Sequence, residues 1–268
     1  MNLHKTSKIA IGQPVFERAW CLPLWFKCLE AQGIPKENIT LCFAYSPGSD
    51  GTLEVLKYYG QEYGDLRIYE YDLPSFSDRD NLARFVTLSQ LRNALLAMVR
   101  ETEVDYFLSW DNDILFQPDS MHWLFDTIQE HGADAVGASI DMGGRNELMG
   151  YPSLMHFPDE SSQIAYRKPW DTYPKDGPFE ADAIMAVKLM TREVVDNSQY
   201  RWDTVGEDIG WCHSLAEQGY SRYLDPRCKG IHMYDKAMSI ETMRKFSTLQ
   251  YPEILPKLDH WYNLGESA

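Results

Sequence analysis

Apolar positions change their spacing along the first half of the chain in a way that predicts strands and helices in turn. Short apolar runs that end in turn-forming residues predict strands, and apolar residues three or four positions apart predict the helices between them. The expected strands cover 8–13, 39–45, 66–73, 106–110 and 133–140, and the expected helices 16–32, 53–63, 81–103 and 120–131. Pro23 lies inside the first helix, which we therefore expect to be kinked or to begin late. The alternation predicts an α/β fold with a mainly parallel sheet flanked by helices on both faces.

The second half of the chain is less regular. Residues 141–178 are polar, rich in glycine and proline and dotted with aromatic residues, which favours a binding loop or a lid. Beyond them the pattern predicts a strand over 183–190, a helix over 206–218 and two short strands over 220–223 and 229–233. No linker or repeat divides the chain, so we expect residues 1–268 to form a single domain whose last part, 236–268, is a tail.

The strand at 106–110 runs directly into Asp111-Asn112-Asp113. Carboxylates at positions i and i+2 of an extended segment point to the same side, so both can approach one hard cation, which in turn can hold a diphosphate. Parallel sheets bind their ligands beyond the carboxyl ends of the strands, which is where these residues fall. An acidic turn without a ligand explains the triplet equally well.

Composition narrows the classes of function. The net charge of −15 repels phosphate backbones and excludes a nucleic-acid partner. An acidic protein that handles an anionic substrate needs a local positive charge, and a metal ion supplies it. No apolar run approaches the ~18 residues that span a bilayer, so we expect no transmembrane segment. The five cysteines include no C-x-x-C pair, and the polar start lacks a signal peptide, so we expect a reduced, cytoplasmic protein.

Three chemical signals follow one another: Asp111-Asn112-Asp113 after a strand, Glu207-Asp208 at the start of a helix, and His232 in a late strand. With the strand–helix alternation, they resemble nucleotide-sugar-dependent glycosyltransferases of the GT-A fold, most of all the Mnn9/Anp1-type and family-two-like enzymes. The resemblance covers roughly residues 8–235. It implies a Rossmann-type sheet, with a nucleotide-sugar-binding half at 8–140 and a smaller acceptor-side, catalytic half at 141–235.

The resemblance also implies a role for each matching position. Asp113, with Asp111 and His232, would hold Mn²⁺ or Mg²⁺, and Asp111 would also contact ribose or sugar. The remaining donor contacts would come from Gln13 and Pro14 at the start of the nucleotide site, Tyr45 and Asp50 around the loop that meets the base or ribose, Arg92 and Asn93 facing the nucleotide sugar, and Trp110 as core or pocket wall. The donor would be a UDP- or GDP-sugar, and the acceptor a glycan, protein or lipid.

Physical reasons accompany these roles. The leaving nucleoside diphosphate gains negative charge, which a divalent cation offsets. If configuration inverts, a carboxylate must deprotonate the acceptor hydroxyl, and Asp208 is the best candidate base. If configuration is retained, Glu207 and Asp208 would instead orient acceptor or sugar. In either case these acids could simply favour a helix N-terminus, and His232 could be a structural histidine.

Other classes of protein remain as alternatives. A catalytically inactive carbohydrate- or nucleotide-binding protein of the same fold would keep the pocket without turnover. A sugar-nucleotide nucleotidyltransferase needs a glycine-rich phosphate loop with a basic residue after the first strand, which Gly12–Phe16 lacks. A glycoside hydrolase would use two carboxylates and water. The absence of G-x-G-x-x-G after the first strand disfavours a dinucleotide oxidoreductase, and the absence of G-K-[ST] disfavours a P-loop ATPase.

Overall fold

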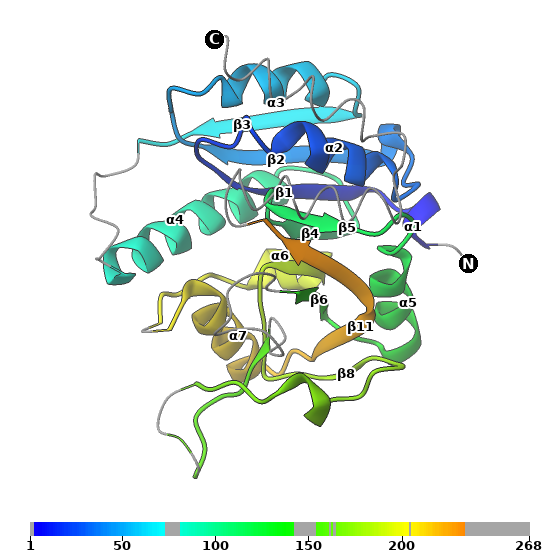
Figure 1. The fold of residues 1–268 in the computed structure, drawn as a ribbon, viewed down its shortest axis with the longest axis vertical. Coiled ribbons are helices and arrows are strands. Elements are labelled where there is room, and N and C mark those ends of the chain that lie inside the picture. Colours follow the sequence, from blue (N-terminus) through cyan, green and yellow to red (C-terminus); the bar gives the residue numbers. More distant parts are fainter. Residues whose placement is uncertain are drawn as a thin grey trace.

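The computed structural model describes residues 3–72, 81–141, 154–160, 162, 165–203 and 205–233. In this part of the chain a nine-stranded sheet runs in the order β3-β2-β1-β4-β10-β6-β11-β5, with β8 beside β11 (Figure 1). Its strands are β1 (Ile9–Val15), β2 (Ile39–Tyr45), β3 (Asp65–Glu70), β4 (Tyr106–Trp110), β5 (Ile114–Phe116), β6 (Ala135–Asp141), β8 (Phe179–Glu180), β10 (Val187–Thr191) and β11 (Arg222–His232). A separate pair joins β7 (Leu154–Met155) to β9 (Ala183–Ile184).

Most strands of the sheet share one direction. β3, β2, β1 and β4 are parallel neighbours, and β6 and β11 form a further parallel pair. β10 runs antiparallel between β4 and β6, and β5 and β8 run antiparallel to β11. The predicted mainly parallel α/β sheet is therefore confirmed. Because β10 is reversed, its beginning lies at the same edge as the ends of β1 and β4.

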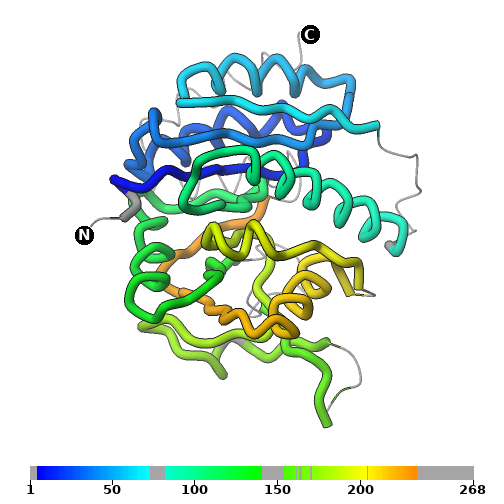
Figure 2. The backbone as a smooth tube through the Cα atoms, turned by 180° about the vertical axis from the view of Figure 1, so that it is seen from behind, coloured from blue at the N-terminus to red at the C-terminus, as the bar shows by residue number. Residues whose placement is uncertain are grey.

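Helices cover both faces of the sheet (Figures 1 and 2). One apolar cluster includes side chains of α2 (Leu22–Glu30), α3 (Thr52–Gly60) and α5 (His122–His131). A second cluster, on the other face, includes side chains of α4 (Asn81–Arg100), α6 (Arg192–Asn197) and α7 (Glu207–Glu217). Alternate residues of β1 enter the two clusters, Ile9 and Ile11 the first and Ala10 the second, as expected of a strand covered on both faces. The short elements are α1 (Leu3–Thr6), η1 (Lys36–Asn38) and η2 (Trp170–Thr172).

Three predicted elements differ from the structure. The helix expected from residue 16 begins only at Leu22, with Pro23 in its first turn, so the late start is confirmed. The strand expected over 183–190 is split into β9 and β10, because Ala186 between them has a left-handed φ of 62°. The two short strands expected after residue 220 are one strand, β11, with an irregularity between Asp225 and Lys229.

The structure also bears on the expectations for the cysteines, for membrane-spanning segments and for the loop and tail. All five cysteines are buried and none forms a disulfide bond, which agrees with a chain that is not a disulfide scaffold. No helix among the described residues is long and apolar enough to cross a membrane. Much of the polar loop at 141–178 and the tail at 236–268 lie outside the described residues.

Candidate functional site

A pocket of about 510 Å³ opens at the edge of the sheet where β1 and β4 end and β10 begins. Pro14 lines it from the end of β1, Asp111 to Asp113 from the end of β4, Ala186 from the start of β10 and His232 from the end of β11. The first turn of α7 contributes Glu207 and Asp208. The topology therefore brings all three chemical signals of the sequence to one site.

Arg92 contacts three carboxylates of this site. It is 4% exposed, and its guanidinium donates to Glu207 Oε1 at 3.0 Å, to Asp111 Oδ1 at 3.1 Å and to Ser109 Oγ at 3.0 Å. Its Nε is also 3.7 Å from Asp208 Oδ1. A buried guanidinium with a planar fork of donors can hold several carboxylates in fixed positions, so Arg92 links the end of β4 to the start of α7.

Asp208 is anchored by two further donors. The ammonium of Lys188, on β10, pairs with Oδ1, and the backbone N–H of Ala186 donates to Oδ2 at 3.2 Å. Lys188 is fully buried, and its Nζ lies 5.3 Å from the ring centroids of both Tyr200 and Trp211. The left-handed conformation of Ala186 thus has a local consequence, because it brings an N–H into contact with a pocket carboxylate.

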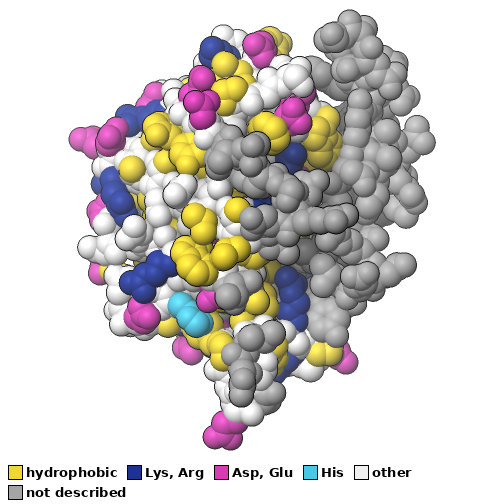
Figure 3. All heavy atoms as spheres, turned by 90° about the vertical axis from the view of Figure 1, so that its left-hand side faces the viewer, with side chains coloured by type: hydrophobic (Ala, Val, Ile, Leu, Met, Phe, Trp, Pro, Cys, Tyr) yellow, Lys and Arg dark blue, Asp and Glu magenta, His cyan; other side chains and the backbone are white. Residues whose placement is uncertain are grey.

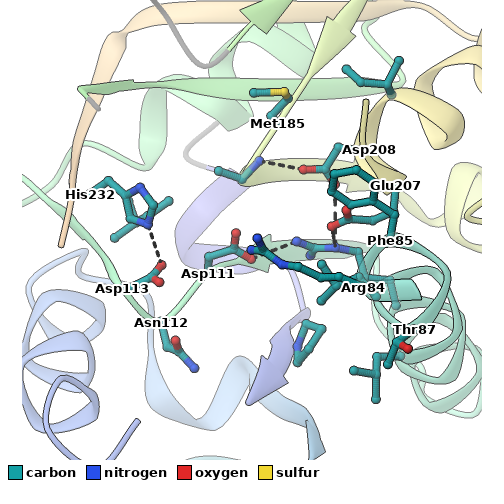
Figure 4. A pocket seen from close by; sticks show the side chains of 18 of the residues that line it. Arg84, Phe85, Thr87, Asp111, Asn112, Asp113, Met185, Glu207, Asp208 and His232 are labelled. Atoms are coloured by element: carbon teal, nitrogen blue, oxygen red, sulfur yellow. Dashed lines mark hydrogen bonds and ion pairs between the residues drawn. The ribbon is translucent and has the colours of Figure 1, made fainter. Parts of the chain in front are cut away.

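Asp113 lies on the opposite side of Asp111 from the Glu207–Asp208 pair (Figure 4). His232 points toward it, with Nε2 at 3.4 Å from Asp113 Oδ1, and Arg18 Nη2 is 3.7 Å from Oδ2. Burial acts to raise the pKa of Asp113, but the hydrogen bond and charge of His232 and the charge of Arg18 outweigh it and lower that pKa. The carboxylate is therefore held in its ionised form, which is the form that binds cations.

The remaining carboxylates differ in proton affinity. Burial raises the pKa of Asp111, although Arg92 opposes it. Burial and the neighbouring charge of Asp208 raise the pKa of Glu207. Burial also acts to raise the pKa of Asp208, but Lys188 and Arg92 overcome that effect and lower it. The pKa values of Glu207 and Asp208, adjacent residues in one helix turn, are thus shifted in opposite directions.

Two side chains in one part of the pocket are of the kinds that ligate divalent cations. Asp113 and His232 supply an oxygen and a nitrogen donor from two strands that meet at Ile114 and His232, where β5 pairs with β11. Carboxylate and imidazole together suit Mn²⁺, and two protein ligands leave positions for a diphosphate and water. Among the described residues no group of three or more His, Cys, Asp or Glu side chains is arranged to hold a metal. The Asp111 carboxylate is turned to Arg92 instead of sharing a site with Asp113 and His232.

Five predicted donor-site residues do not line the pocket. Gln13 and Trp110 are fully buried, and Tyr45 is 6% exposed. The side chain of Asn93 exchanges hydrogen bonds with the backbone of Tyr200. Asp50 accepts from Thr52 and from the backbone N–H of Ala19, so it orders the loop after β1. Of the predicted residues, the pocket brings together Pro14, Arg92, Asp111, Asp113, Glu207, Asp208 and His232.

Sequence reasoning missed four cations at the site: Lys188, which pairs with Asp208, and the pocket residues Arg18, Arg84 and Arg167. Lys188 interrupts an otherwise apolar strand, and a lysine in such a place requires a buried counter-charge, so this signal was present in the sequence. Arg18 lies three residues beyond the end of β1, and nothing in its local pattern indicates a site. Its loop is ordered by Thr52, whose hydroxyl accepts from the backbone N–H groups of Arg18 and Ala19.

The molecule presents charged and apolar side chains together on the face toward which the amino-terminal end of α4 points (Figure 3). Apolar side chains gather near the centre of that face, among acidic and basic ones.

Four arginines line the pocket itself, at positions 18, 84, 92 and 167, in a chain whose net charge is −15. These arginines balance the four carboxylates of the pocket, so the pocket is less negative than the rest of this acidic protein, which favours an anionic ligand.

Comparison with known proteins places the fold. No protein-family model and no curated protein matches the sequence. The mannosyltransferase PcManGT from Pyrobaculum calidifontis, in complex with GDP-Man and Mn²⁺, aligns with a TM-score of 0.55 at 11% identity, over 86% of this chain and 58% of that chain. S. aureus TarS 1–349 aligns with TM-scores of 0.52 (UDP-GlcNAc complex) and 0.53 (UDP complex), at 13% and 14% identity, over 87% and 88% of this chain and 60% and 63% of that chain.

This chain therefore spans about three fifths of the length of these solved structures. At such low identities the likeness concerns the fold, and a narrower Mnn9/Anp1-type relationship does not follow from it. The chain shares the GT-A-like fold of these solved structures, with its pocket at the carboxyl edge of the sheet.

Proposed function

We propose that this chain is a metal-dependent glycosyltransferase that moves a sugar from a nucleoside-diphosphate sugar to an acceptor hydroxyl. One observation carries the proposal: the Asp113–His232 pair lies beside the Arg92 network of Asp111, Glu207 and Asp208 in a single pocket. A nucleoside-diphosphate sugar needs both parts, one for its charged diphosphate and one for its uncharged sugar and the incoming hydroxyl.

The donor is a UDP- or GDP-sugar in this proposal. Support comes from the solved structures of the same fold, one with GDP-Man and others with UDP-GlcNAc and UDP. In this proposal residues of 8–140 and His232 form the nucleotide side of the pocket, and other residues of 141–235, including Met185 and Glu207, form the opposite side. The acceptor is a hydroxyl of a glycan, protein or lipid.

Asp113 and His232 would hold Mn²⁺ or Mg²⁺ in this proposal, and Asp111 would contact the donor from its place on Arg92. The ion, when bound, offsets the negative charge of the departing diphosphate. Arg18 adds a positive charge on the same side, where it faces Asp113. Asp111 remains beside the diphosphate as an oriented acceptor for a ribose or sugar hydroxyl, because Arg92 binds only one of its oxygens.

The acceptor side depends on the stereochemistry of transfer. An inverting reaction needs a carboxylate that takes the proton of the acceptor hydroxyl, and Glu207 and Asp208 are the pocket carboxylates at the start of α7. A retaining reaction needs no such base, and the same two side chains would orient the acceptor or the sugar.

Release of nucleoside diphosphate from a panel of UDP- and GDP-sugars, with Mn²⁺ or with a chelator, tests the proposal. We expect one base to support metal-dependent release, and Asp113→Ala to abolish it while the protein stays folded. Asp196→Ala is the matched control, because Asp196 is an exposed aspartate of α6 outside the pocket. Unchanged release in Asp113→Ala would contradict the proposal, and tight nucleotide binding without release from any sugar would favour an inactive binding protein.

A further inference from the structure

Lys188, the second residue of β10, is fully buried. Register places it opposite Ser109 of β4 and Gly137 of β6, in the centre of the sheet. A buried ammonium is costly unless a carboxylate compensates its charge. Asp208 provides that carboxylate, and the rings of Tyr200 and Trp211 stabilise the cation from its other sides.

Charge in this buried cluster does not balance when every group is ionised. Two cations, Arg92 and Lys188, contact three carboxylates: Asp111, Glu207 and Asp208. The sum is +2 and −3, so among the ion pairs of the described residues one negative charge of this cluster is not compensated, although Arg84 and Arg167 also line the pocket. Tyr200 also faces the cluster, and burial raises its pKa, so it stays neutral, whereas Asp113 acts on Asp111 from the other side but has His232 and Arg18 as its own partners. One bound proton would neutralise the cluster.

Geometry decides which carboxylate holds that proton. Asp208 is compensated by all of Lys188, by the N–H of Ala186 and in part by Arg92. Glu207 shares Arg92 with Asp111, through Oε1, and its further compensation by the charge of Lys188 and by its own backbone N–H is weaker. A protonated Glu207 still accepts that hydrogen bond through its carbonyl oxygen, whereas a protonated Asp208 would leave Lys188 as an uncompensated buried charge.

We propose that Lys188 is a positioning residue that holds Asp208 as an ionised, fixed carboxylate and thereby makes Glu207 the member of the pair that binds and releases a proton. The assignment itself does not depend on the proposed function; its catalytic consequence does. In an inverting transfer, Glu207 first releases its proton to solvent. The acceptor oxygen then bonds to the anomeric carbon as the bond to the diphosphate breaks, and the proton of the hydroxyl passes to the ionised Glu207 carboxylate, which returns it to solvent after product release.

Thermal unfolding as a function of pH tests the assignment without any substrate. A carboxyl group whose pKa is raised by folding stabilises the protein below its unfolded pKa, and that stabilisation is lost as pH rises through the folded pKa. Glu207→Gln mimics the protonated state at every pH. Its Tm, relative to the wild type, should therefore increase between about pH 4.5 and pH 8, by about 3 °C for each unit by which folding raises the pKa.

Asp208→Asn should behave differently over the same range. A carboxylate whose pKa is lowered by folding is ionised in both states above its unfolded pKa, so the Tm of this variant should be lower than that of the wild type by a constant amount. Glu193→Gln and Asp196→Asn, at exposed positions of α6, are matched controls and should show no pH-dependent difference. The proposal would be overturned if the Tm difference from the wild type increased with pH for Asp208→Asn and stayed constant for Glu207→Gln.

Removal of Lys188 distinguishes positioning from simple packing. In a Lys188→Met background, Asp208 has lost its counter-charge. The Tm difference caused by Asp208→Asn should therefore increase with pH in this background, although it is constant with pH in the wild-type background. If Lys188→Met does not fold, the double variant Lys188→Met/Asp208→Asn should recover most of the lost Tm, because neither charge is left without its partner. The role of Lys188 would be overturned by a Tm difference for Asp208→Asn that stays constant with pH in the Lys188→Met background. It would also be overturned if the double variant lost as much Tm as the two single variants together.

Discussion

Arg92 reaches carboxylates that lie about twenty and more than a hundred residues away in sequence, Asp111 and the Glu207–Asp208 pair. Its side chain is 5% exposed, and the carboxylates of Glu207 and Asp208 are 8% and 12% exposed. Ion pairs in such surroundings differ from surface pairs, because water cannot compensate a charge whose partner is removed. The site is therefore also part of what holds α4, β4 and α7 together.

Substitution Arg92→Met should lower the free energy of unfolding by about 3–5 kcal/mol, because two buried carboxylates lose their cation. Urea denaturation followed by fluorescence measures this loss. Arg67→Met is the control: Arg67 pairs with Asp65 and Glu101 at the surface and should cost at most about 1 kcal/mol. Equal effects of the two substitutions would show that the Arg92 network does not contribute as a buried charge cluster.

Helix α7 is held in place by a close backbone contact at its second turn. A Cβ on Gly210 would lie 2.2 Å from the carbonyl oxygen of Arg201 and 3.2 Å from the backbone of Trp202, so only glycine permits this approach. The contact sets the position of the first turn, which carries Glu207 and Asp208. Gly206, with φ of 141°, leads the chain into that turn.

Gly210→Ala should therefore destabilise the protein by about 1–3 kcal/mol, although alanine is the better helix former. It should also reduce donor turnover, since α7 must shift to relieve the clash. The control is Gly177→Ala, where a Cβ meets nothing within 4 Å, and its effect should stay within about 0.5 kcal/mol. An unchanged free energy of unfolding for Gly210→Ala in chemical denaturation would contradict the close contact between Gly210 and the backbone of Arg201.

Elements with a strong local pattern were predicted well from the sequence. The apolar run at Ile39–Tyr45 was predicted with its observed bounds, and the helix expected over 81–103 is α4, Asn81–Arg100. The three-residue strand β5 was missed because Ile114–Phe116 is too short to show a period. The division at Ala186 was missed because alanine gives no sign of a left-handed conformation.

Pairing between distant residues accounts for what the sequence did not reveal about the site. The strand-end position of Asp111 and Asp113 could be read from local pattern, but the turn of Asp111 toward Arg92 could not. Gln13 was assigned to the donor by resemblance, yet it is fully buried because side chains alternate between the two faces of a strand, and Trp110, expected in the core or the pocket wall, lies in the core. Only the assembled sheet brings Lys188 of β10 to Asp208 of α7.

Across the whole molecule, the two apolar clusters exclude water from every cysteine. Each of the five is at most 1% exposed, and burial raises the pKa of Cys42 and of Cys212 to about 12. Buried thiols with raised pKa values react slowly with disulfide reagents. We expect almost no thiol to react in the native protein and all five after denaturation, in a single cooperative transition with urea. A thiol that reacts rapidly under native conditions would contradict the packing of its cluster.

Calorimetric titration of the protein with UDP and with GDP, each with and without Mn²⁺, tests the central claim most directly. The account predicts that one nucleotide binds in a metal-dependent manner, that Asp113→Ala and His232→Ala each abolish the metal dependence, and that Asp196→Ala leaves it intact. Binding of neither nucleotide by a cooperatively folded wild-type protein would contradict the account, and Asp111-Asn112-Asp113 would then be an acidic turn at the end of β4.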